Sequence, residues 1–569
     1  MDDPIVDKSV IIAGTSGTGL RSLYKCLEKG KLRLPENTCV FHFEDVLLEE
    51  PSNMPCSDIE QITALMLTSK PSAMRVFRKA IEKIRARAEK RGCRRLIVIA
   101  HLTYLSHRSI ITNPVLGDLL NLGVEASIVY MTEDFYDALY DMALTARDRI
   151  YPGRKGCSSI PSIPYSIDPV LYLTWRAADI NVLNIAENIK PGTTIYLFGV
   201  KHPYQAFQQL LTRVLMTRKE ELSGDAPPTA YVSHPITQVR EVFVALRHTP
   251  LRDIPLAYMI EAFKDAVRRR RPRLVLFEPT TIDETHKDWL SRIMEKIPQA
   301  STISLCEKLC KTQPQQREPQ DRPVTHSIVV DSYNRWPVAR DNLREYCEGQ
   351  RTYDYLVEGE VSLLDDIFSI LYGKDLYEHI VLDVAYNNFA TGEMGDRLKG
   401  IISTQINDMV LAQIEERDYA YVSQSDFIIA VTTAIIVPEG VEGLEPGVYI
   451  PYSTGMDAEI QRARALTKPT IYYILPLCLE ALEKKARDDD ARRALYKAVK
   501  HGFRRCDTAS PGCDDETAVK AVRDCAVKVQ EGGLFSTIGG GVRVCAVPVV
   551  VRGDESYKEL VKRYAESLC

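Results

Sequence analysis

Short apolar, β-branched runs alternate with longer amphipathic stretches along most of this chain, and this alternation constrains the fold more than any other feature. The first part contains five such runs, namely VIIAG (10–14), CVFHF (39–43), RLIVIAHL (95–102), ASIVYM (126–131) and TTIYLFGV (193–200). Helical patterns such as 73–91 and 134–147 separate them. Buried strands separated by helices are typical of a parallel sheet that is covered on both faces. The first part is therefore predicted to be an α/β domain.

A charged stretch with Gly and Pro at 217–229 indicates a linker, after which the alternation restarts. The later runs are AYVSHPI (230–236), RLVLFEP (273–279), HSIVVDSY (326–333), HIVLDVAY (379–386), DFIIAVT (426–432) and PTIYYIL (469–475). A Gln/Pro-rich stretch at 311–325 lacks periodicity and indicates an insertion. A helix is predicted at about 399–416, where Ile402, Ile406, Val410 and Ile414 recur every fourth residue. The tail from about 480 contains a charged helix and the strand VRVCAVPVVV.

The predicted architecture is thus α/β, with two parallel-sheet, Rossmann-like, three-layer domains and a small carboxyl-terminal α/β segment. We place the domains at 1–220 and 230–480, with an insertion at about 311–395 in the second one, and the helical and strand segment at 481–569. The length of 569 residues is compatible with this division, because single cores rarely grow beyond about 250–300 residues.

Charge and hydropathy exclude several classes of partner. The 72 basic and 77 acidic side chains give a net charge of −5, so no overall field attracts nucleic acid or anionic lipid. The longest nearly apolar stretch, 427–437, is too short to span a membrane, and the first residues lack the pattern of a signal peptide. We expect a cytoplasmic protein with no membrane partner and no clear nucleic-acid partner.

The fourteen cysteines include no CxxC pair. Cys306 and Cys310 lie one helical turn apart, but no histidine cluster accompanies them, so no metal site is predicted. Buried thiols and disulfides both remain open for these cysteines.

The sequence GTSGTGLRS at 14–22 lies between a predicted strand and a predicted helix. A phosphate-binding loop in this context needs glycines, so that backbone N–H groups can converge on phosphate oxygens, a lysine for the terminal phosphates and a Ser or Thr hydroxyl for magnesium. Gly14, Gly17 and Gly19 meet the first requirement. Leu20 and Arg21 stand where the lysine and the hydroxyl would be.

With this loop and the strand RLIVIAHLTY, which includes His101 and Thr103, the segment 1–215 resembles archaeal adenylate kinase-like P-loop nucleoside monophosphate kinases. The resemblance implies a degenerate P-loop domain in which the loop residues Gly14, Gly17, Gly19, Arg21 and Ser22 would contact a bound nucleotide. Because the lysine is missing, a nucleotide-binding or structural domain is favoured over an active kinase.

Three motifs in the second half occur in a defined order. The first is Tyr231 to Pro235 in the opening strand, the second is Gln424-Ser425-Asp426 before an apolar strand, and the third is Ser453-x-Gly455-x-x-x-Glu459. With these motifs the segment 230–475 resembles the nucleoside 2-deoxyribosyltransferase superfamily, which includes nucleoside 5′-monophosphate N-glycosidases.

The resemblance implies a role for each matching residue. Glu459 would be the nucleophile that forms a glycosyl ester during cleavage of the N-glycosidic bond. Asp426 would contact the base or assist its departure, and Tyr231 would orient the nucleophile or the sugar. The remaining substrate-binding positions are Ser453 and Gly455, where a helix N-terminus could hold a 5′-phosphate, together with Ser233 and Pro235. This chemistry requires no cofactor, and the resemblance makes a homodimer plausible.

Other interpretations stay open. Thr454 and Asp457 have the spacing of a capped helix start, in which case Glu459 would be a solvated acid. The leading hypothesis is an N-glycosidase or (deoxy)ribosyltransferase acting on a nucleoside or nucleoside 5′-monophosphate. The alternative is a non-catalytic nucleotide-binding sensor or scaffold with two nucleotide-type domains, and a third hypothesis is a nucleotide kinase. A nucleotide bound in the first domain is compatible with all three.

Overall fold

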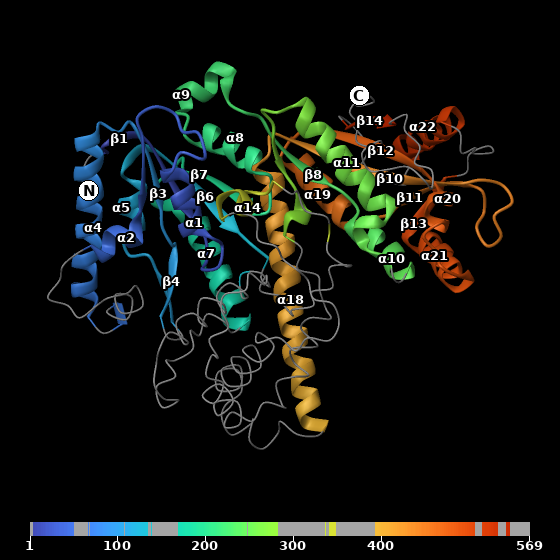
Figure 1. The fold of residues 1–569 in the computed structure, drawn as a ribbon, viewed down its shortest axis with the longest axis horizontal. Helices are drawn as coiled ribbons and strands as arrows, with labels where there is room; N and C mark the ends of the chain where they lie inside the picture. Colours follow the sequence, from blue (N-terminus) through green and yellow to red (C-terminus); the bar gives the residue numbers. More distant parts are fainter. Residues whose placement is uncertain are drawn as a thin grey trace, which may run out of the picture.

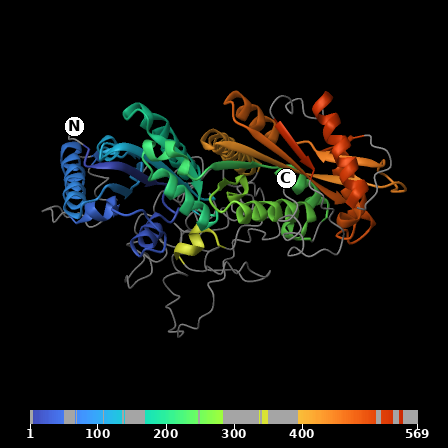
Figure 2. The same ribbon diagram turned by 90° about the horizontal axis from the view of Figure 1, so that it is seen from above.

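A computed structural model describes residues 4–49, 66–67, 69–106, 109–134, 138, 169–246, 249–282, 336, 341–348, 393–506, 515–532 and 542–546. The predicted strands at 326–333 and 379–386, and Cys306 and Cys310, lie outside these residues. The α/β class is confirmed. Figures 1 and 2 show two sheet-containing halves side by side along the long axis of the molecule, with a long helix at their junction. No helix in the described ranges is long and apolar enough to cross a membrane.

The first half is built on a five-stranded parallel sheet with the order β2-β3-β1-β6-β7. Its strands are β1 (Val6–Ala13), β2 (Thr38–His42), β3 (Arg95–Ile99), β6 (Gly123–Thr132) and β7 (Thr194–Gly199). A hairpin of β4 (Thr103–Ser106) and β5 (Ser109–Thr112) lies off this sheet. The helices are α1 (Leu20–Glu28), α2 (Phe43–Leu48), α4 (Lys70–Arg91), α5 (Leu116–Leu120), α7 (Pro169–Ile189) and α8 (Tyr204–Val214). All five predicted strands of this half are confirmed.

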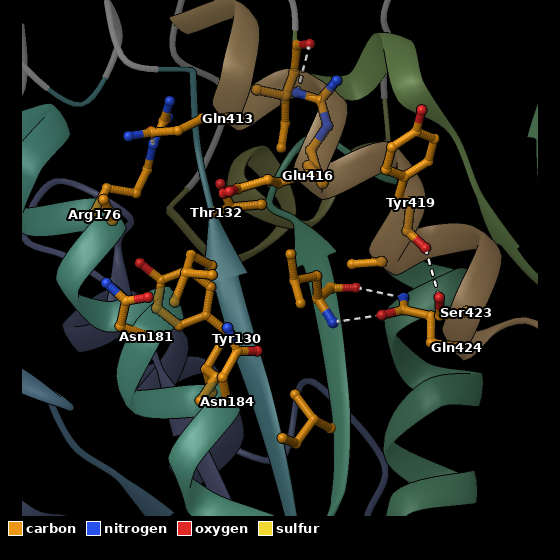
Figure 3. A pocket seen from close by; sticks show the side chains of 18 of the residues that line it. Tyr130, Thr132, Arg176, Asn181, Asn184, Gln413, Glu416, Tyr419, Ser423 and Gln424 are labelled. Carbon is orange, nitrogen blue, oxygen red and sulfur yellow. Dashed lines mark hydrogen bonds between the residues drawn. The ribbon is translucent and has the colours of Figure 1, made fainter. Parts of the chain in front are cut away.

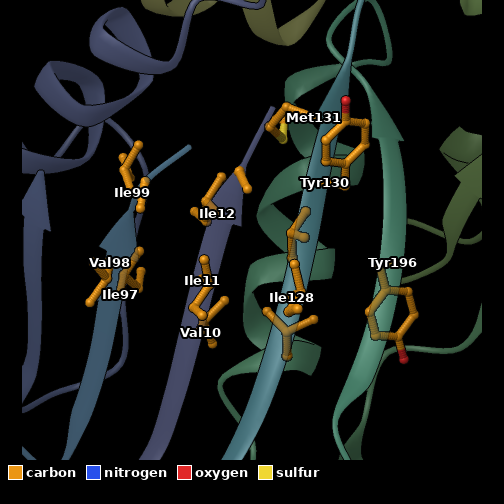
Figure 4. Packing of buried hydrophobic residues seen from close by; sticks show 14 of the residues in the cluster. Val10, Ile11, Ile12, Ile97, Val98, Ile99, Ile128, Tyr130, Met131 and Tyr196 are labelled. Carbon is orange, nitrogen blue, oxygen red and sulfur yellow. The ribbon is translucent and has the colours of Figure 1, made fainter. Parts of the chain in front are cut away.

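The core of this half consists of apolar side chains on consecutive strand positions. Val10, Ile12, Ile97, Ile99 and Ile128 are fully buried, and Figure 4 shows them on the adjacent strands β3, β1 and β6. Both faces of the sheet are covered, which explains why its strands are nearly continuous apolar runs rather than alternating ones.

The second half contains a seven-stranded sheet that includes β8 (Thr229–Ser233), β9 (Val275–Phe277), β10 (Phe427–Val437), β11 (Gly447–Pro451), β12 (Thr470–Cys478), β13 (Phe503–Cys506) and β14 (Val542–Ala546). Strands β9, β8, β10, β12 and β14 pair in parallel. However, β11 pairs with both β10 and β13 in an antiparallel arrangement, so the expectation of a wholly parallel second sheet is wrong at this edge. Strand β10 is long enough to pair with β8 along its first half and with β11 along its second.

The helices of this half are α10 (Ile236–Ala245), α11 (Pro255–Arg270), α19 (Thr454–Ala465), α20 (Leu479–Glu483), α21 (Asp489–Gly502) and α22 (Asp515–Gly532), and α18 (Glu393–Gln424) lies at the junction. The short helix α14 (Leu343–Glu348) packs on α1 and α8 of the first half, although it lies within the predicted insertion at 311–395. The predicted linker at 217–229 contains the short helix α9 (Arg218–Glu220) and a π-helical turn at Glu221–Asp225. Strands β13 and β14 belong to the main sheet although they lie beyond residue 480. The predicted helix at 399–416 is part of α18, which runs eight residues further.

The two halves are joined by specific polar contacts. The side-chain amide of Gln424, at the end of α18, accepts from the Leu197 N–H at 2.7 Å and donates to the Leu197 carbonyl at 2.8 Å. It thereby satisfies the backbone of β7, the edge strand of the first sheet. Arg213 of α8 donates two hydrogen bonds to Asp426, at 2.7 and 3.0 Å. The buried core of the first half also includes Tyr421 of α18, so the halves share apolar packing as well.

Three disulfides occur in the described part of the chain, namely Cys26–Cys347, Cys39–Cys93 and Cys506–Cys525. The first one ties α14 to α1 across 321 residues of sequence. Beside it, Tyr204 and Tyr346 stack with ring centroids 3.8 Å apart. For these six cysteines the structure therefore decides the question that the sequence left open.

Candidate active site

The Glu459 carboxyl is held between strand β8 and helix α18. Tyr231 and Ser233 are two residues apart on β8, so their side chains share one face of the strand. The Tyr231 hydroxyl donates to Glu459 Oε1 at 2.9 Å, and the Ser233 hydroxyl donates to Oε2. Both carboxyl oxygens are thus engaged by the strand that the sequence analysis associated with this glutamate.

The surroundings of Glu459 make its ionisation unfavourable. The residue is only 9% exposed, and burial is the main cause that raises its pKa to about 8. Asp418 of α18 adds like-charge repulsion, while the hydroxyls of Ser233 and Tyr231 and the Arg417 guanidinium oppose the shift. A carboxyl that titrates near neutral pH in a buried site is suited to exchange between a neutral and a nucleophilic form.

Two of the charged residues around this carboxyl escaped the sequence analysis. Arg417 donates to Asp418 Oδ1 through Nε and Nη2, at 3.1 Å each, and to the Ile282 carbonyl at 3.3 Å. Both side chains lie on the continuation of α18 beyond the predicted end at residue 416. A solvated acid, the simpler interpretation of Glu459, does not agree with its burial among these groups.

Asp426 lies at the other end of β8 from Ser233. Its carboxylate accepts from Arg213 and from the Thr229 N–H at 2.8 Å, and Thr229 is the first residue of the strand. The register that pairs Ser233 with Ala430 places Asp426 before the start of β10. Four residues of strand separate Thr229 from Ser233, or roughly 13 Å, so Asp426 does not join Glu459 in one site. In the structure it links the two halves.

Ser453 is the N-cap of α19, and its hydroxyl accepts from the Met456 N–H at 3.3 Å. The helix is therefore capped as the simpler interpretation expected, but by Ser453 rather than Thr454. A methyl group added at Gly455 would contact only the Ser453 hydroxyl, at 3.8 Å, so this turn is uncovered by the described residues. Pro235 is the N-cap position of α10 and follows directly on the strand that carries Tyr231 and Ser233.

The glycine loop between β1 and α1 is packed against other parts of the chain. Gly17 has φ +89°, and a Cβ there would lie 2.6 Å from the Ala138 carbonyl oxygen. A Cβ at Gly14 would lie 2.7 Å from the Met131 carbonyl oxygen, and one at Gly19, where φ is +75°, would lie 3.0 Å from Glu348 Oε1. A carboxylate of α14 therefore lies beside the amino end of α1, where a phosphate-binding loop would hold its anion.

Arg21 and Ser22 follow this loop in the first turn of α1. The Arg21 guanidinium is 3.3 Å from Asp45 and its side chain is 68% exposed, so it does not take the place of the missing lysine. Ser22 borders a cavity of about 350 Å³, whose wall also includes Lys25, Lys29, Lys31 and Glu348. Arg21 therefore does not replace the missing lysine of this loop.

A buried polar cluster of Glu44, His101, Thr103 and Asp179 lies at the end of β3. The resemblance to the kinases had pointed only to His101 and Thr103 of this cluster. Glu44 accepts from the His101 N–H at 2.9 Å and lies 3.0 Å from the His101 ring nitrogen. Burial alone would raise the pKa of Glu44, but the interactions with His101 outweigh it and lower that pKa to about 2. Thr103 donates to Asp179 at 2.6 Å, and burial raises the pKa of Asp179 to about 7.

A cavity of about 580 Å³ lies between α7, α18 and the β6 and β7 strands (Figure 3). Three residues of its wall connect it to the surroundings of Glu459. Arg417 and Tyr419 of α18 interact electrostatically with Glu459, and Arg462 of α19 lies one turn after Glu459 on the same helix. Glu459 itself does not line it. Within the described ranges, no group of three or more His, Cys, Asp or Glu side chains has an arrangement that could hold a metal ion.

No protein-family model matches the chain, and no curated protein matches it significantly.

Proposed function

We propose that the second half of the chain is an N-glycosidase or (deoxy)ribosyltransferase acting on a nucleoside or nucleoside 5′-monophosphate, with Glu459 as the nucleophile. The observation that carries the proposal is the engagement of both Glu459 oxygens by Tyr231 and Ser233 in a buried environment. The order of the motifs in the second half, which resembles that of the nucleoside 2-deoxyribosyltransferase superfamily, also supports it.

In the proposed reaction, an ionised Glu459 oxygen attacks the anomeric carbon while the N-glycosidic bond breaks. The bonding electrons leave with the base, which takes up a proton from solvent, and an ester forms between Glu459 and the sugar. Water or a second base then attacks the anomeric carbon and releases Glu459. Tyr231 and Ser233 hold the carboxylate in place, and their hydrogen bonds favour its ionised form.

Asp426 has no role in this proposal, because its carboxylate is committed to Arg213 and the Thr229 N–H. Ser453 uses its hydroxyl for the helix cap. A 5′-phosphate at the start of α19 would therefore be bound by backbone N–H groups near Gly455 rather than by the Ser453 side chain.

A second candidate is a non-catalytic nucleotide-binding sensor or scaffold. It is favoured by the raised pKa of Glu459, since a carboxyl that is neutral at pH 7 can also serve as a buried hydrogen-bonding group without chemistry. It is also compatible with the glycine loop, which lacks a lysine and has the Glu348 carboxylate beside it.

The purified protein should be incubated with a panel of nucleosides and 5′-monophosphates, and the free base followed by chromatography. We expect release that E459Q abolishes and that E480Q, a change at an exposed carboxylate on α20, leaves unchanged. Binding without release by the wild-type protein would favour the sensor. Release that persists in E459Q would refute the assignment of the nucleophile.

A further inference from the structure

The cavity between α7 and α18 is built from both halves of the chain. Its wall includes Tyr130 and Thr132 of β6, Ile195 and Leu197 of β7, and residues of α7, α18 and α19. At about 580 Å³ it lies within the range of about 300–1,000 Å³ that is usual for sites of small ligands. Its position at the junction of two α/β units is also common for such sites.

Several polar side chains hold the wall in a fixed geometry. Arg176 donates to the Gln413 side-chain oxygen at 2.5 Å, and Gln413 in turn donates to the Leu173 carbonyl at 2.8 Å. Gln424 pairs with the Leu197 backbone, and Ser423 donates to the Tyr419 carbonyl at 2.8 Å. A wall with committed hydrogen bonds loses little conformational entropy when a ligand binds.

Four other polar side chains line the cavity. Asn181 and Asn184 are exposed and lie one turn apart on α7, and Figure 3 shows them across the cavity from Glu416 and Tyr419 of α18. No hydrogen bond or ion pair among the described residues involves the side chains of Asn181, Asn184, Glu416 and Arg462. Two amides offer donors and acceptors together, Glu416 offers an acceptor, and Arg462 offers a planar cation.

The remaining wall combines apolar and basic side chains. Ile180, Leu183, Ile195 and Leu197 supply an apolar surface. Arg176 donates to Gln413 and Arg417 pairs with Asp418, whereas Arg462 carries the cation that the proposal uses. The combination fits a ligand with a planar polar ring, hydroxyl groups and one anionic group. A ring would rest on the apolar surface with its edge toward the asparagines, a hydroxyl would donate to Glu416, and the anion would pair with Arg462.

We propose that this cavity is a ligand site for a nucleoside monophosphate, separate from the site at Glu459. The proposal does not rest on the proposed function, because none of these contacts involves Glu459, Tyr231 or Ser233. A ligand held there would contact α7 in one half and α18 in the other, and would stabilise the junction between them.

The test measures binding of adenosine 5′-monophosphate, adenosine and inorganic phosphate by calorimetry in the full-length E459Q protein, so that base release cannot consume the probe. We expect the monophosphate to bind more tightly than adenosine or phosphate alone. N181A/N184A and R462E should each weaken binding at least tenfold, since each removes hydrogen bonds or a charge pair. N188A and R464E are matched controls on the same two helices and should leave binding unchanged.

Three results would overturn the proposal. They are the absence of monophosphate binding, binding that the cavity variants leave unchanged, and inorganic phosphate binding as tightly as the monophosphate. The proposed function is tested by a different measurement, which is base release by the wild-type protein. Failure of one proposal can therefore be told apart from failure of the other. Thermal unfolding of each variant checks that a loss of binding does not arise from loss of the fold.

Discussion

The Glu459 carboxyl should make the stability of the protein depend on pH, and E459Q should remove this dependence. In the folded protein its pKa is raised from 4.5 to about 8, chiefly by burial. The folded state therefore holds this proton more tightly than the unfolded state does. The stability that Glu459 contributes is fully present below about pH 4.5, declines as the pH rises and is lost at about pH 8.

The size of the change in the free energy of unfolding follows from the pKa shift of Glu459. Each pH unit between the two pKa values changes the free energy of unfolding by about 1.4 kcal/mol, so the wild type should lose roughly 3 kcal/mol between pH 4.5 and pH 7 on account of this group. A glutamine in its place is neutral throughout and can still hydrogen-bond the hydroxyls of Tyr231 and Ser233, since a hydroxyl both donates and accepts.

The assay is denaturant unfolding of the wild type, E459Q and E480Q at pH 5, 6, 7 and 8. E459Q should become progressively more stable than the wild type as the pH rises. E480Q, whose side chain is 55% exposed, should follow the wild type at every pH. A difference between E459Q and the wild type that stays constant from pH 5 to pH 8 would refute the argument, because the carboxyl would then titrate alike in the folded and unfolded states.

Three further predictions concern activity and the junction between the halves. The kcat/KM for base release should rise with pH up to about 8, because only the ionised carboxylate attacks. Y231F should move this rise to higher pH, because it removes a hydrogen bond that favours ionisation of Glu459. A kcat/KM that falls over this range would contradict both predictions. D426N should leave base release unchanged and reduce the free energy of unfolding by about 1 kcal/mol, because Asp426 is partly exposed and pairs with Arg213. A large loss of base release in a folded D426N variant would instead support the catalytic role that the resemblance implies. C93S, which removes the disulfide between Cys39 and Cys93, should lower the free energy of unfolding by about 2–4 kcal/mol, measured by denaturant unfolding under non-reducing conditions. An unchanged unfolding midpoint would argue against the disulfide.

The sequence predicted the strands of the first half because buried parallel strands carry an unbroken apolar signal. The same signal located β8, β10 and β12. The Ser453-x-Gly455-x-x-x-Glu459 motif placed Glu459 in the first turns of a helix, and in the structure it lies in the second turn of α19. The convergence of Tyr231 and Ser233 on Glu459 could also be anticipated, since alternate residues of a strand share a face.

Other features depend on tertiary packing and could not be predicted from local sequence patterns. Asp418 and Arg417 act on Glu459 because α18 continues to Gln424, and nothing in the local pattern shows which face of those last turns is buried. Asp426 stands in a motif that suggests a ligand site, yet Arg213, more than 200 residues earlier, takes its carboxylate. Similarly, β11 turned out antiparallel because the direction of a short strand is decided by its neighbours rather than by its residues.

The pairing of Gln424 with the Leu197 backbone has a practical consequence for dissecting the protein. An unpaired edge strand is a template for association with other chains, and here one amide side chain and the last turns of α18 cover the edge of β7. A truncation that ends near residue 220 would keep every strand of the first sheet and still expose that edge. Such a fragment would also lack Tyr421 and the partner of Cys26, so we expect it to self-associate, and the first half is better studied within the whole chain than alone.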